Sequence, residues 1–471
     1  MNDDDIAWLG IDALAGLIRQ RRLSATEATQ AMLRRIARLD PGLRAYARTT
    51  PERALAQAAE ADGRIARGER IGPLHGVPIA VKDLCWTAGV VTAAGTTIHR
   101  DFVPPVDGTV VRRLQEAGAV LLGKLQLTEG AFSAHHPDIA PPLNPWNADT
   151  WTGVSSSGSG VAVAAALCHG AIGTDTGGSI RYPSVANGVT GLKPTWGRVS
   201  RHGAFELAAS LDHLGPMCRS AADCGLMLGA IAGADPDDPT ALQAPVPDYL
   251  AGSAARLDGL RIGIDEVYAS RDAAPEVVDA VQAALRVLVG QGAVAVPVTM
   301  PPVDPVIAGW VGHCGVEAAV AHAATFPSRR AEYGPVLAAL LDTGLALGGT
   351  EYQRILLARA EFTGRMHALM QQVDLLIMPV IPFAAPSLEQ IAQLRTQPGH
   401  RLQLMRFTAP FDMSGHPTLT MPAGFTAAGP ALPAQAQLAP AVRSGRDAQL
   451  DLARQRRHGH RRAERGLPRH H

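Results

Sequence analysis

From Gly72 onward, short apolar runs alternate with Gly-rich turns and helical stretches. Residues 77–81 and 119–122 are typical of buried strands, and residues 109–117 repeat their apolar positions at helical spacing. Strands that alternate with helices usually form a parallel or mixed sheet with helices on its faces. This alternation constrains the fold more than any other feature of the sequence, and it predicts an α/β protein.

A second unit of the same kind occupies the middle of the chain. Residues 260–265 and 293–298 have the pattern of strands, and the helical segment 275–289 lies between them. The order strand, helix, strand is that of a βαβ unit, although no catalytic motif accompanies it. We find no internal repeat and no linker that would divide the chain into separate domains.

The first 66 residues are expected to form a helical scaffold. Ser24 and Glu27 stand at the spacing of a capping box, and apolar positions then repeat at helical spacing. Pro41-Gly42 is expected to end this helix, and residues 51–67 supply a second, Ala-rich helix. The α/β core would then extend over residues 67–425.

Residues 426–471 differ in composition from the rest of the chain. They are rich in Arg and His, and they contain no Ile, Phe, Trp, Tyr or Met. A segment of this kind buries little apolar surface. We therefore expect an atypical, basic and weakly ordered C-terminal tail.

The chain combines 46% apolar residues with 18% charged residues, and its 43 Lys and Arg balance its 43 Asp and Glu. This composition supports a large core, excludes a wholly disordered chain and disfavours nucleic-acid binding through bulk charge. No apolar run reaches the roughly 20 residues that a bilayer requires, and the first residues are acidic where a secretory signal would be basic. We therefore expect a cytoplasmic protein with no membrane partner, whose five cysteines are buried, reduced thiols.

Two Gly- and Ser-rich loops carry the most informative pattern. Residues 151–160 read Trp-Thr-Gly-Val-Ser-Ser-Ser-Gly-Ser-Gly, and residues 173–183 read Gly-Thr-Asp-Thr-Gly-Gly-Ser-Ile-Arg-Tyr-Pro. Taken alone, such loops are more often linkers or phosphate cradles than catalytic sites. The chain has neither a Walker-type lysine motif nor GxGxxG after its first strand, so nucleotide binding is disfavoured. It also lacks the GxSxG and HExxH motifs of two common hydrolase classes.

Within these loops, residues 153–159 and 173–183 resemble the two halves of the amidase signature. The segment Gly-Val-Pro-Ile-Ala-Val-Lys-Asp at 76–83 is similar to that family's lysine segment. Further segments of similarity are residues 191–200, 211–217 and 407–412, so the resemblance covers roughly residues 10–425. It implies a single α/β/α domain with a mixed, mostly parallel sheet. It also implies hydrolysis of carbon–nitrogen bonds by a Ser-Ser-Lys triad, without metal or cofactor.

By position in the family's motifs, the resemblance makes Ser179 the nucleophile, Ser155 the bridging serine and Lys82 the base. A serine hydroxyl is a poor nucleophile until a neighbour removes its proton, and a lysine can do so only when neutral. Burial beside other donors lowers the pKa of a lysine and so favours its neutral form. The resemblance also implies a cis peptide bond between Val154 and Ser155.

The loop that carries the nucleophile is expected to stabilise the oxyanion of the tetrahedral intermediate through backbone N–H groups. Glycines suit this role because no Cβ obstructs the approaching carbonyl. The donors implied by the resemblance are those of Thr176, Gly177, Gly178 and Ser179. Asp175 and Arg181 are expected to form a buried brace beneath the loop, because buried charges need partners.

Several side chains near the reactive motifs are candidates for the substrate pocket. They are Phe132, His135, Trp151 and Tyr182. For each aromatic residue, packing in the core is an equally good interpretation. His135 and His136 precede Pro137, and adjacent histidines in such a loop more often line or cover a pocket than bind a metal.

The leading hypothesis is an amidase acting on small-molecule amides, with esters and carbamates as accompanying substrates because all three can acylate a serine. The alternative is the glutaminase component of a tRNA-dependent glutamine amidotransferase, which resembles the same family and requires partner subunits. Residues 130–136 do not resemble the matching segment of such components. A third hypothesis is a catalytically impaired relative with an altered C-terminus. The sequence is compatible with a homodimer.

Overall fold

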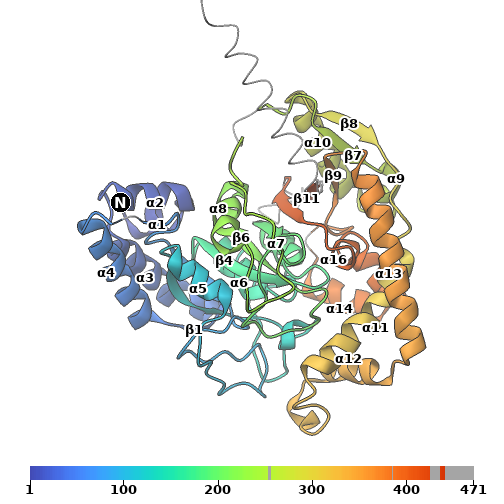
Figure 1. Ribbon diagram of the computed structural model, residues 1–471, viewed down its shortest axis with the longest axis horizontal. Coiled ribbons are helices and arrows are strands. Elements are labelled where there is room, and N and C mark those ends of the chain that lie inside the picture. Colours follow the sequence, from blue (N-terminus) through green and yellow to red (C-terminus); the bar gives the residue numbers. More distant parts are fainter. Residues whose placement is uncertain (70, 253–255, 385, 425–434, 441–471) are drawn as a thin grey trace, which may run out of the picture.

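The described part of the chain is organised around one continuous sheet (Figure 1). The computed structural model describes residues 1–69, 71–252, 256–384, 386–424 and 435–440, the last of these as backbone only. The strands are β1 Tyr46–Thr49, β2 Pro78–Lys82, β3 Val120–Leu125, β4 Gly170–Asp175, β5 Thr190–Lys193, β6 His213–Cys218, β7 Arg261–Ile264, β8 Val294–Pro297, β9 Leu375–Pro379, β10 Thr418–Pro422 and β11 Gln435–Pro440. Across the sheet they follow the order β1-β3-β2-β4-β6-β5-β10-β11-β9-β7-β8.

Parallel pairing is confined to two groups of strands. β2 pairs in parallel with β3 and β4, and β7 pairs in parallel with β8 and β9. The strands between the two groups, and β1 at the edge, pair antiparallel. The expected α/β fold with a mixed sheet is confirmed, with parallel pairs at the two βαβ-like units and antiparallel pairs joining them.

The α-helices of the described residues are α1 Asp3–Ala7, α2 Ile11–Arg19, α3 Ala25–Leu43, α4 Pro51–Ala66, α5 Thr109–Glu116, α6 Ser157–Ala164, α7 Arg181–Asn187, α8 Ala221–Ile231, α9 Glu266–Ser270, α10 Pro275–Gly290, α11 Asp304–Ala321, α12 Pro335–Ala346, α13 Gly349–Met370, α14 Leu388–Thr396, α15 His400–Met405 and α16 Ala409–Met413. Two 3-10 helices are η1 Glu129–Ala131 and η2 Arg330–Glu332.

Strand β4 lies between two layers of helices. A Cβ added at Gly170 would meet Met227 of α8, whereas one at Gly173 would meet Ser156 and Ile180, which directly precede α6 and α7. Positions three apart on a strand face opposite sides of the sheet. Helix α8 therefore covers one face and helices α6 and α7 cover the other, which is the expected α/β/α arrangement.

The N-terminal segment contains the expected helices and one unexpected strand. Ser24 and Glu27 form the predicted capping box at the start of α3. Helix α3 continues through Pro41 and ends before Arg44, whose φ of 56° is left-handed, so the predicted end at Pro41-Gly42 is wrong by a short distance. Residues 46–49 form β1 and pair antiparallel with β3. This strand is too short to show a sequence period.

Strand β11 corrects the expected C-terminal tail. The backbone of residues 435–440 lies between β10 and β9, where Leu438 is opposite Leu419 on one side and Ile377 on the other. The segment reads Gln-Ala-Gln-Leu-Ala-Pro and has no β-branched or aromatic residue, so its composition did not indicate a strand. The expectation of a weakly ordered tail for residues 426–434 and 441–471 lies outside the described residues.

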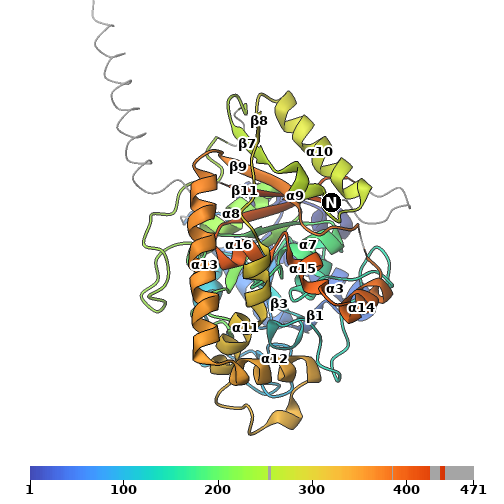
Figure 2. The ribbon, with the colours of Figure 1, turned by 90° about the vertical axis from the view of Figure 1, so that its right-hand side faces the viewer.

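Helices α11, α12 and α13 form a group at one side of the sheet (Figure 2). Helix α11 contacts both α12 and α13, and it also contacts α15 and α16. The five cysteines are buried and unpaired, as expected. Within the described part of the chain, every helix falls short of the length and apolar character needed to cross a bilayer.

Candidate active site

Lys82 is the last residue of β2, and its side chain is fully buried. Its Nζ donates hydrogen bonds to three hydroxyls, at 2.6 Å to Ser155 Oγ, 3.0 Å to Ser156 Oγ and 2.7 Å to Thr174 Oγ1. Burial is the largest influence on this amine, and it lowers the pKa of Lys82 to about 7. A substantial fraction of Lys82 is therefore neutral near neutral pH.

Two other buried lysines have different partners. Lys124 lies 3.3 Å from a carboxylate oxygen of Asp83, which raises the pKa of Lys124, although burial has the larger effect and lowers that pKa overall. Lys193 donates to the backbone carbonyl of His416 at 2.7 Å, and a carbonyl can only accept hydrogen bonds. The partners of Lys82 are hydroxyls, which can accept a proton from an ammonium or donate one to a neutral amine. The pKa of Lys193 is also lowered to about 7, so the three hydroxyl partners, and not the pKa alone, distinguish Lys82.

The first Ser-rich loop leads into α6 and places two serines beside Lys82. The peptide bond between Val154 and Ser155 is cis, the conformation that the resemblance implies. Ser156 is fastened to β4, because its Oγ donates to the Thr174 carbonyl and accepts from the Thr174 N–H, both at 3.1 Å. The hydroxyl of Ser155 has Lys82 as its hydrogen-bond partner. Of the two serines, Ser155 is the better placed to exchange a proton.

Ser179 lies between β4 and α7 and lines a cavity. Its backbone carbonyl accepts a hydrogen bond from the Ser156 N–H at 3.3 Å, so the two loops are adjacent. The hydroxyls of Ser155 and Ser179, both in the described part of the chain, share no direct hydrogen bond. The structure brings Lys82 and Ser155 into contact, and it places Ser179 on the neighbouring loop.

The backbone N–H groups around Ser179 are not equivalent. Gly178 donates its N–H to Asp175 Oδ1 at 2.6 Å, so this group is occupied and cannot serve as the expected oxyanion donor without breaking that bond. The N–H groups of Thr176, Gly177 and Ser179 have no acceptor among the described residues, and these three residues line the cavity. Of the four expected donors, three have an N–H group without an acceptor in the described part of the chain, and that of Gly178 is engaged.

Asp175 and Arg181 form a buried ion pair with two parallel hydrogen bonds, from Nε at 2.9 Å and from Nη2 at 2.8 Å. Burial alone would raise the pKa of Asp175, but the charge of Arg181 overcomes this effect and holds that pKa well below its usual range. Arg181 also donates to the Thr408 carbonyl and to Asp412. The sequence motifs indicated no role for Thr408 or Asp412, although both lie in the segment 407–412 that carries part of the resemblance.

The cavity beside Ser179 has a volume of about 270 Å³. Its apolar lining includes Phe132, Val154, Tyr182, Leu207, Leu404 and Met405. Phe132 and Tyr182 were expected there. Trp151 is buried behind Tyr182, with the two ring centroids 5.7 Å apart, and it does not line this cavity.

His135 is not part of the cavity wall either. Its Nε2 lies 3.3 Å from Ser157 Oγ, and burial lowers the pKa of His135 to about 4. The ring is therefore neutral at neutral pH and packs against the base of α6. Across the described residues, no group of three or more His, Cys, Asp or Glu side chains is placed to hold a metal ion.

Trp310 of α11 is a cavity residue that the sequence motifs did not reveal. Its ring lines the cavity, and its Nε1 donates to the Thr176 carbonyl at 2.9 Å. Thr408 similarly donates to the Gly177 carbonyl at 2.8 Å. These two bonds join the loop to α11 and to the residue that precedes α16. No local motif marks Trp310, because it lies far from Ser179 in the sequence.

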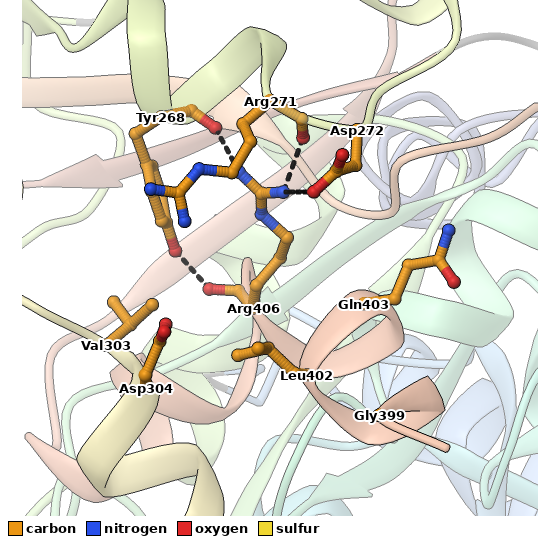
Figure 3. A pocket seen from close by; sticks show the side chains of 9 residues that line it. All are labelled: Tyr268, Arg271, Asp272, Val303, Asp304, Gly399, Leu402, Gln403 and Arg406. Atoms are coloured by element: carbon orange, nitrogen blue, oxygen red, sulfur yellow. Dashed lines mark hydrogen bonds and ion pairs between the residues drawn. The ribbon is translucent and has the colours of Figure 1, made fainter. Parts of the chain in front are cut away.

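A second cavity, of about 250 Å³, lies between α9, α15 and the start of α11, and its lining residues are drawn in Figure 3. None of the predicted site residues lines it. Arg406 donates to the backbone carbonyls of Tyr268 and Arg271, and the Tyr268 hydroxyl donates back to the Arg406 carbonyl. These bonds anchor the C-terminal end of α15 to α9. Because Leu404 and Met405 of α15 line the first cavity, Arg406 helps to fix one of its walls.

The family profile described as Amidase matches residues 27–441 of this sequence. The chain belongs to the amidase signature family. A Mycobacterium tuberculosis protein named "Putative amidase AmiD" is 48% identical over 437 residues, which cover 92% of this chain and 91% of that protein. A Geobacter protein, the A component of a glutamyl-tRNA(Gln) amidotransferase, is 38% identical over 452 residues, covering 90% of this chain and 92% of that protein.

Solved structures of amidases have a fold similar to that of this chain. The native peptide amidase from Stenotrophomonas maltophilia superposes with a TM-score of 0.77 at 32% identity, covering 92% of this chain and 93% of that one. The expected family, the fold and the enzyme class, an amidase that acts on carbon–nitrogen bonds, are confirmed. The family match extends through β11 to residue 441, beyond the core boundary at residue 425 that the sequence indicated.

Proposed function

We propose that this amidase hydrolyses small-molecule amides through an acyl-enzyme on Ser179, with Ser155 as proton relay and Lys82 as general base. The observation that carries the proposal is the environment of the Lys82 amine. It is buried among three hydroxyls, including that of Ser155 at 2.6 Å, and its pKa is lowered to about 7. A lysine in this state can accept a proton near neutral pH.

In the acylation step, the Ser179 oxygen attacks the amide carbon and a new carbon–oxygen bond forms. The Ser179 proton passes to Ser155, whose own proton passes to Lys82. Collapse of the intermediate breaks the carbon–nitrogen bond, and Ser155 delivers a proton to the departing amine while Lys82 returns one to Ser155. The lack of a Ser155–Ser179 hydrogen bond is compatible with this order, because such bonds often tighten only when substrate binds.

In the deacylation step, water attacks the ester bond to Ser179 and gives a proton to the same relay. The carbon–oxygen bond to Ser179 breaks, and the serine recovers its proton. The unpartnered N–H groups of Thr176, Gly177 and Ser179 would stabilise the oxyanion in both steps. Esters and carbamates are included in the proposal because both acylate serine by the same route.

The buried charges beneath the loop support this assignment. Asp175 accepts the N–H of Gly178 and is itself held by Arg181, so the turn before Ser179 is fixed from within. We assign Asp175 and Arg181 a positioning role, because they touch the loop and not the cavity. The proposed setting is the cytoplasm, where the five unpaired thiols would remain reduced.

A second candidate function is that of the glutaminase component of a tRNA-dependent glutamine amidotransferase. The 38% identical Geobacter amidotransferase component favours it. A protein with an amidase name is 48% identical over 437 residues, whereas an amidotransferase A component from Methylococcus capsulatus reaches 48% identity over 290 residues. Incubating the purified chain with glutamine separates the two. Ammonia release that depends on added partner proteins and tRNA would favour the amidotransferase, whereas hydrolysis of simple amides by the chain alone would favour the amidase.

The proposal is tested by treating the purified chain with a fluorophosphonate and locating the adduct by peptide mass spectrometry. The Ser179 oxygen would form a bond to phosphorus as fluoride leaves, with the proton passing to Lys82. We expect labelling at Ser179 that is lost in Ser179→Ala and in Lys82→Ala. Ser157→Ala is the matched control in the same region and should retain the label, because among the described residues the Ser157 hydroxyl hydrogen-bonds to His135 and not to Lys82, Ser155 or Ser179. A folded wild type labelled elsewhere, or not at all, would contradict the proposal.

A further inference from the structure

The mouth of the cavity beside Ser179 carries positive charge and no negative charge. The described residues that line this cavity include no Asp and no Glu. The lining does include Arg395 of α14 and His400 and Arg401 of α15. The arginines lie at the exposed end of a cavity whose deeper wall is apolar.

The two guanidinium groups are not neutralised by the protein. Arg395 donates one hydrogen bond to the Ser133 carbonyl at 2.9 Å, which leaves its other N–H groups available. No carboxylate of a described residue lies within 4.0 Å of either arginine. Arg395 and Arg401 therefore remain free to bind an anionic ligand, unlike exposed arginines such as Arg329 and Arg330, which are paired with Glu332 and Asp342.

Helix α15 connects the charged mouth to the apolar interior. Arg401, Leu404 and Met405 all line the cavity, and their spacing places them on one face of the helix. Met405 also approaches Gly177, since a Cβ at that glycine would meet the Met405 methyl at 3.0 Å. One face of α15 therefore extends from the proposed oxyanion site to the arginine-lined mouth, about four residues or 6 Å along the helix axis.

We propose that the preferred substrates are amides whose acyl chain ends in an anionic group such as a carboxylate. This inference rests on the proposed acyl-enzyme at Ser179. The apolar part of the acyl chain would pack against Tyr182, Leu404 and Met405, and its anionic end would meet Arg395 and Arg401. Guanidinium groups bind carboxylates through paired N–H donors. A cleft with low-dielectric walls also concentrates anions more strongly than an open surface does.

The acyl side is assigned by the course of the reaction. The acyl group stays bonded to Ser179 after the amine has left, so it must occupy the cavity that contains Ser179 and the three free N–H groups. The amine departs before water attacks, so it needs a path to solvent and no lasting site. The charged mouth is therefore matched to the group that remains.

The test compares two fluorophosphonates that share the same pentyl-length chain, one ending in a carboxylate and the other in a methyl group. The measurement is the second-order rate constant for labelling of Ser179, followed by intact mass. We expect the anionic probe to react about tenfold faster at low salt, with the ratio falling as salt is added because the arginines are exposed. The ratio should approach one in the double variant Arg395→Gln, Arg401→Gln.

Arg286→Gln is the matched control, because Arg286 is an exposed arginine of α10 that does not line the cavity. It should keep the wild-type ratio. The double variant Arg395→Gln, Arg401→Glu should reverse the preference toward the neutral probe, a result that misfolding cannot mimic because misfolding lowers both rates. Equal rates for the two probes on the wild type, or a ratio unchanged in the double variant Arg395→Gln, Arg401→Gln, would overturn the inference while leaving the amidase assignment intact. Failure of both probes to label Ser179 would overturn the acyl-enzyme proposal and this inference with it.

Discussion

Arg181 and Asp175 lie side by side in the protein interior, joined by parallel hydrogen bonds of 2.9 and 2.8 Å. The exposed pair Arg34 and Asp3 has the same fork geometry, with both hydrogen bonds at 2.8 Å. The first pair is fully buried, whereas Arg34 is 59% exposed. The chain therefore contains the same two-bond pair in a buried and an exposed environment, and the buried arginine in addition donates to Thr408 and Asp412.

Arg181→Lys is expected to lower the free energy of unfolding by about 3 kcal/mol. A lysine cannot form the fork, so part of the buried Asp175 carboxylate loses its partner. Arg34→Lys, with the same change at the exposed pair, should cost less than about 1 kcal/mol. Urea denaturation followed by circular dichroism measures both. Equal losses in the two variants would show that burial does not determine the strength of the Arg181 pair.

Lys82→Met is expected to change how stability depends on pH. The pKa of Lys82 is about 7 in the folded protein and 10.5 in the absence of burial, so between these values the unfolded chain binds more protons. The free energy of unfolding of the wild type should therefore rise with pH in this window, by about 1.4 kcal/mol per pH unit from this group. The variant should lack this contribution. Lys193, whose pKa is also lowered to about 7, is present in both proteins and cancels. A difference between the two proteins that is flat from pH 7 to about 10 would contradict the burial effect.

The value of kcat/KM for an amide substrate should rise with pH through an apparent pKa of about 7, because Lys82 accepts a proton only when neutral. Asp212, which holds the loop before Ser179, is a competing group. Burial raises its pKa to about 6, and it accepts a hydrogen bond from Thr176 Oγ1 at 2.6 Å. A pH profile of Asp212→Asn decides between them. The rise of kcat/KM with pH should keep its apparent pKa near 7 in this variant. Disappearance of the rise would assign it to Asp212.

Both serines contact Lys82, but Ser155→Ala is expected to affect mainly kcat and Ser156→Ala mainly the free energy of unfolding. Ser155→Ala should lower kcat about 10²- to 10⁴-fold and change the free energy of unfolding by no more than about 1 kcal/mol. Ser156→Ala leaves the Thr174 N–H without its partner, so it should destabilise the protein by about 1–3 kcal/mol with a smaller loss of kcat. Steady-state kinetics and urea unfolding on the same samples give both quantities. A larger loss of kcat in Ser156→Ala would exchange the roles of the two serines.

The fold was predictable where a strand is a continuous apolar run. Strands β2 and β7 are largely buried, and the continuous apolar runs in their sequences predicted buried strands. Strands β1 and β11 were missed for two reasons. Residues 46–49 are too few to display alternation, and residues 435–440 lack the side chains that favour strands.

The site was predictable where it consists of contiguous motifs. Ser155, Ser179 and Lys82 were located by such motifs, and the structure brings them to one region. Trp310 and Arg401 could not be found in this way, because they reach the cavity from helices far along the chain. The engagement of the Gly178 N–H by Asp175 also depends on backbone direction, which residue types do not specify.

The position of β11 has a consequence for biosynthesis. The ribosome makes residues 435–440 after all the other strands that the structure describes, yet this strand fills the gap between β10 and β9. Until it emerges, each of these strands presents a row of unsatisfied backbone groups to the surrounding solution. Such rows readily pair with another polypeptide, so nascent chains are most exposed to aggregation just before translation reaches this segment.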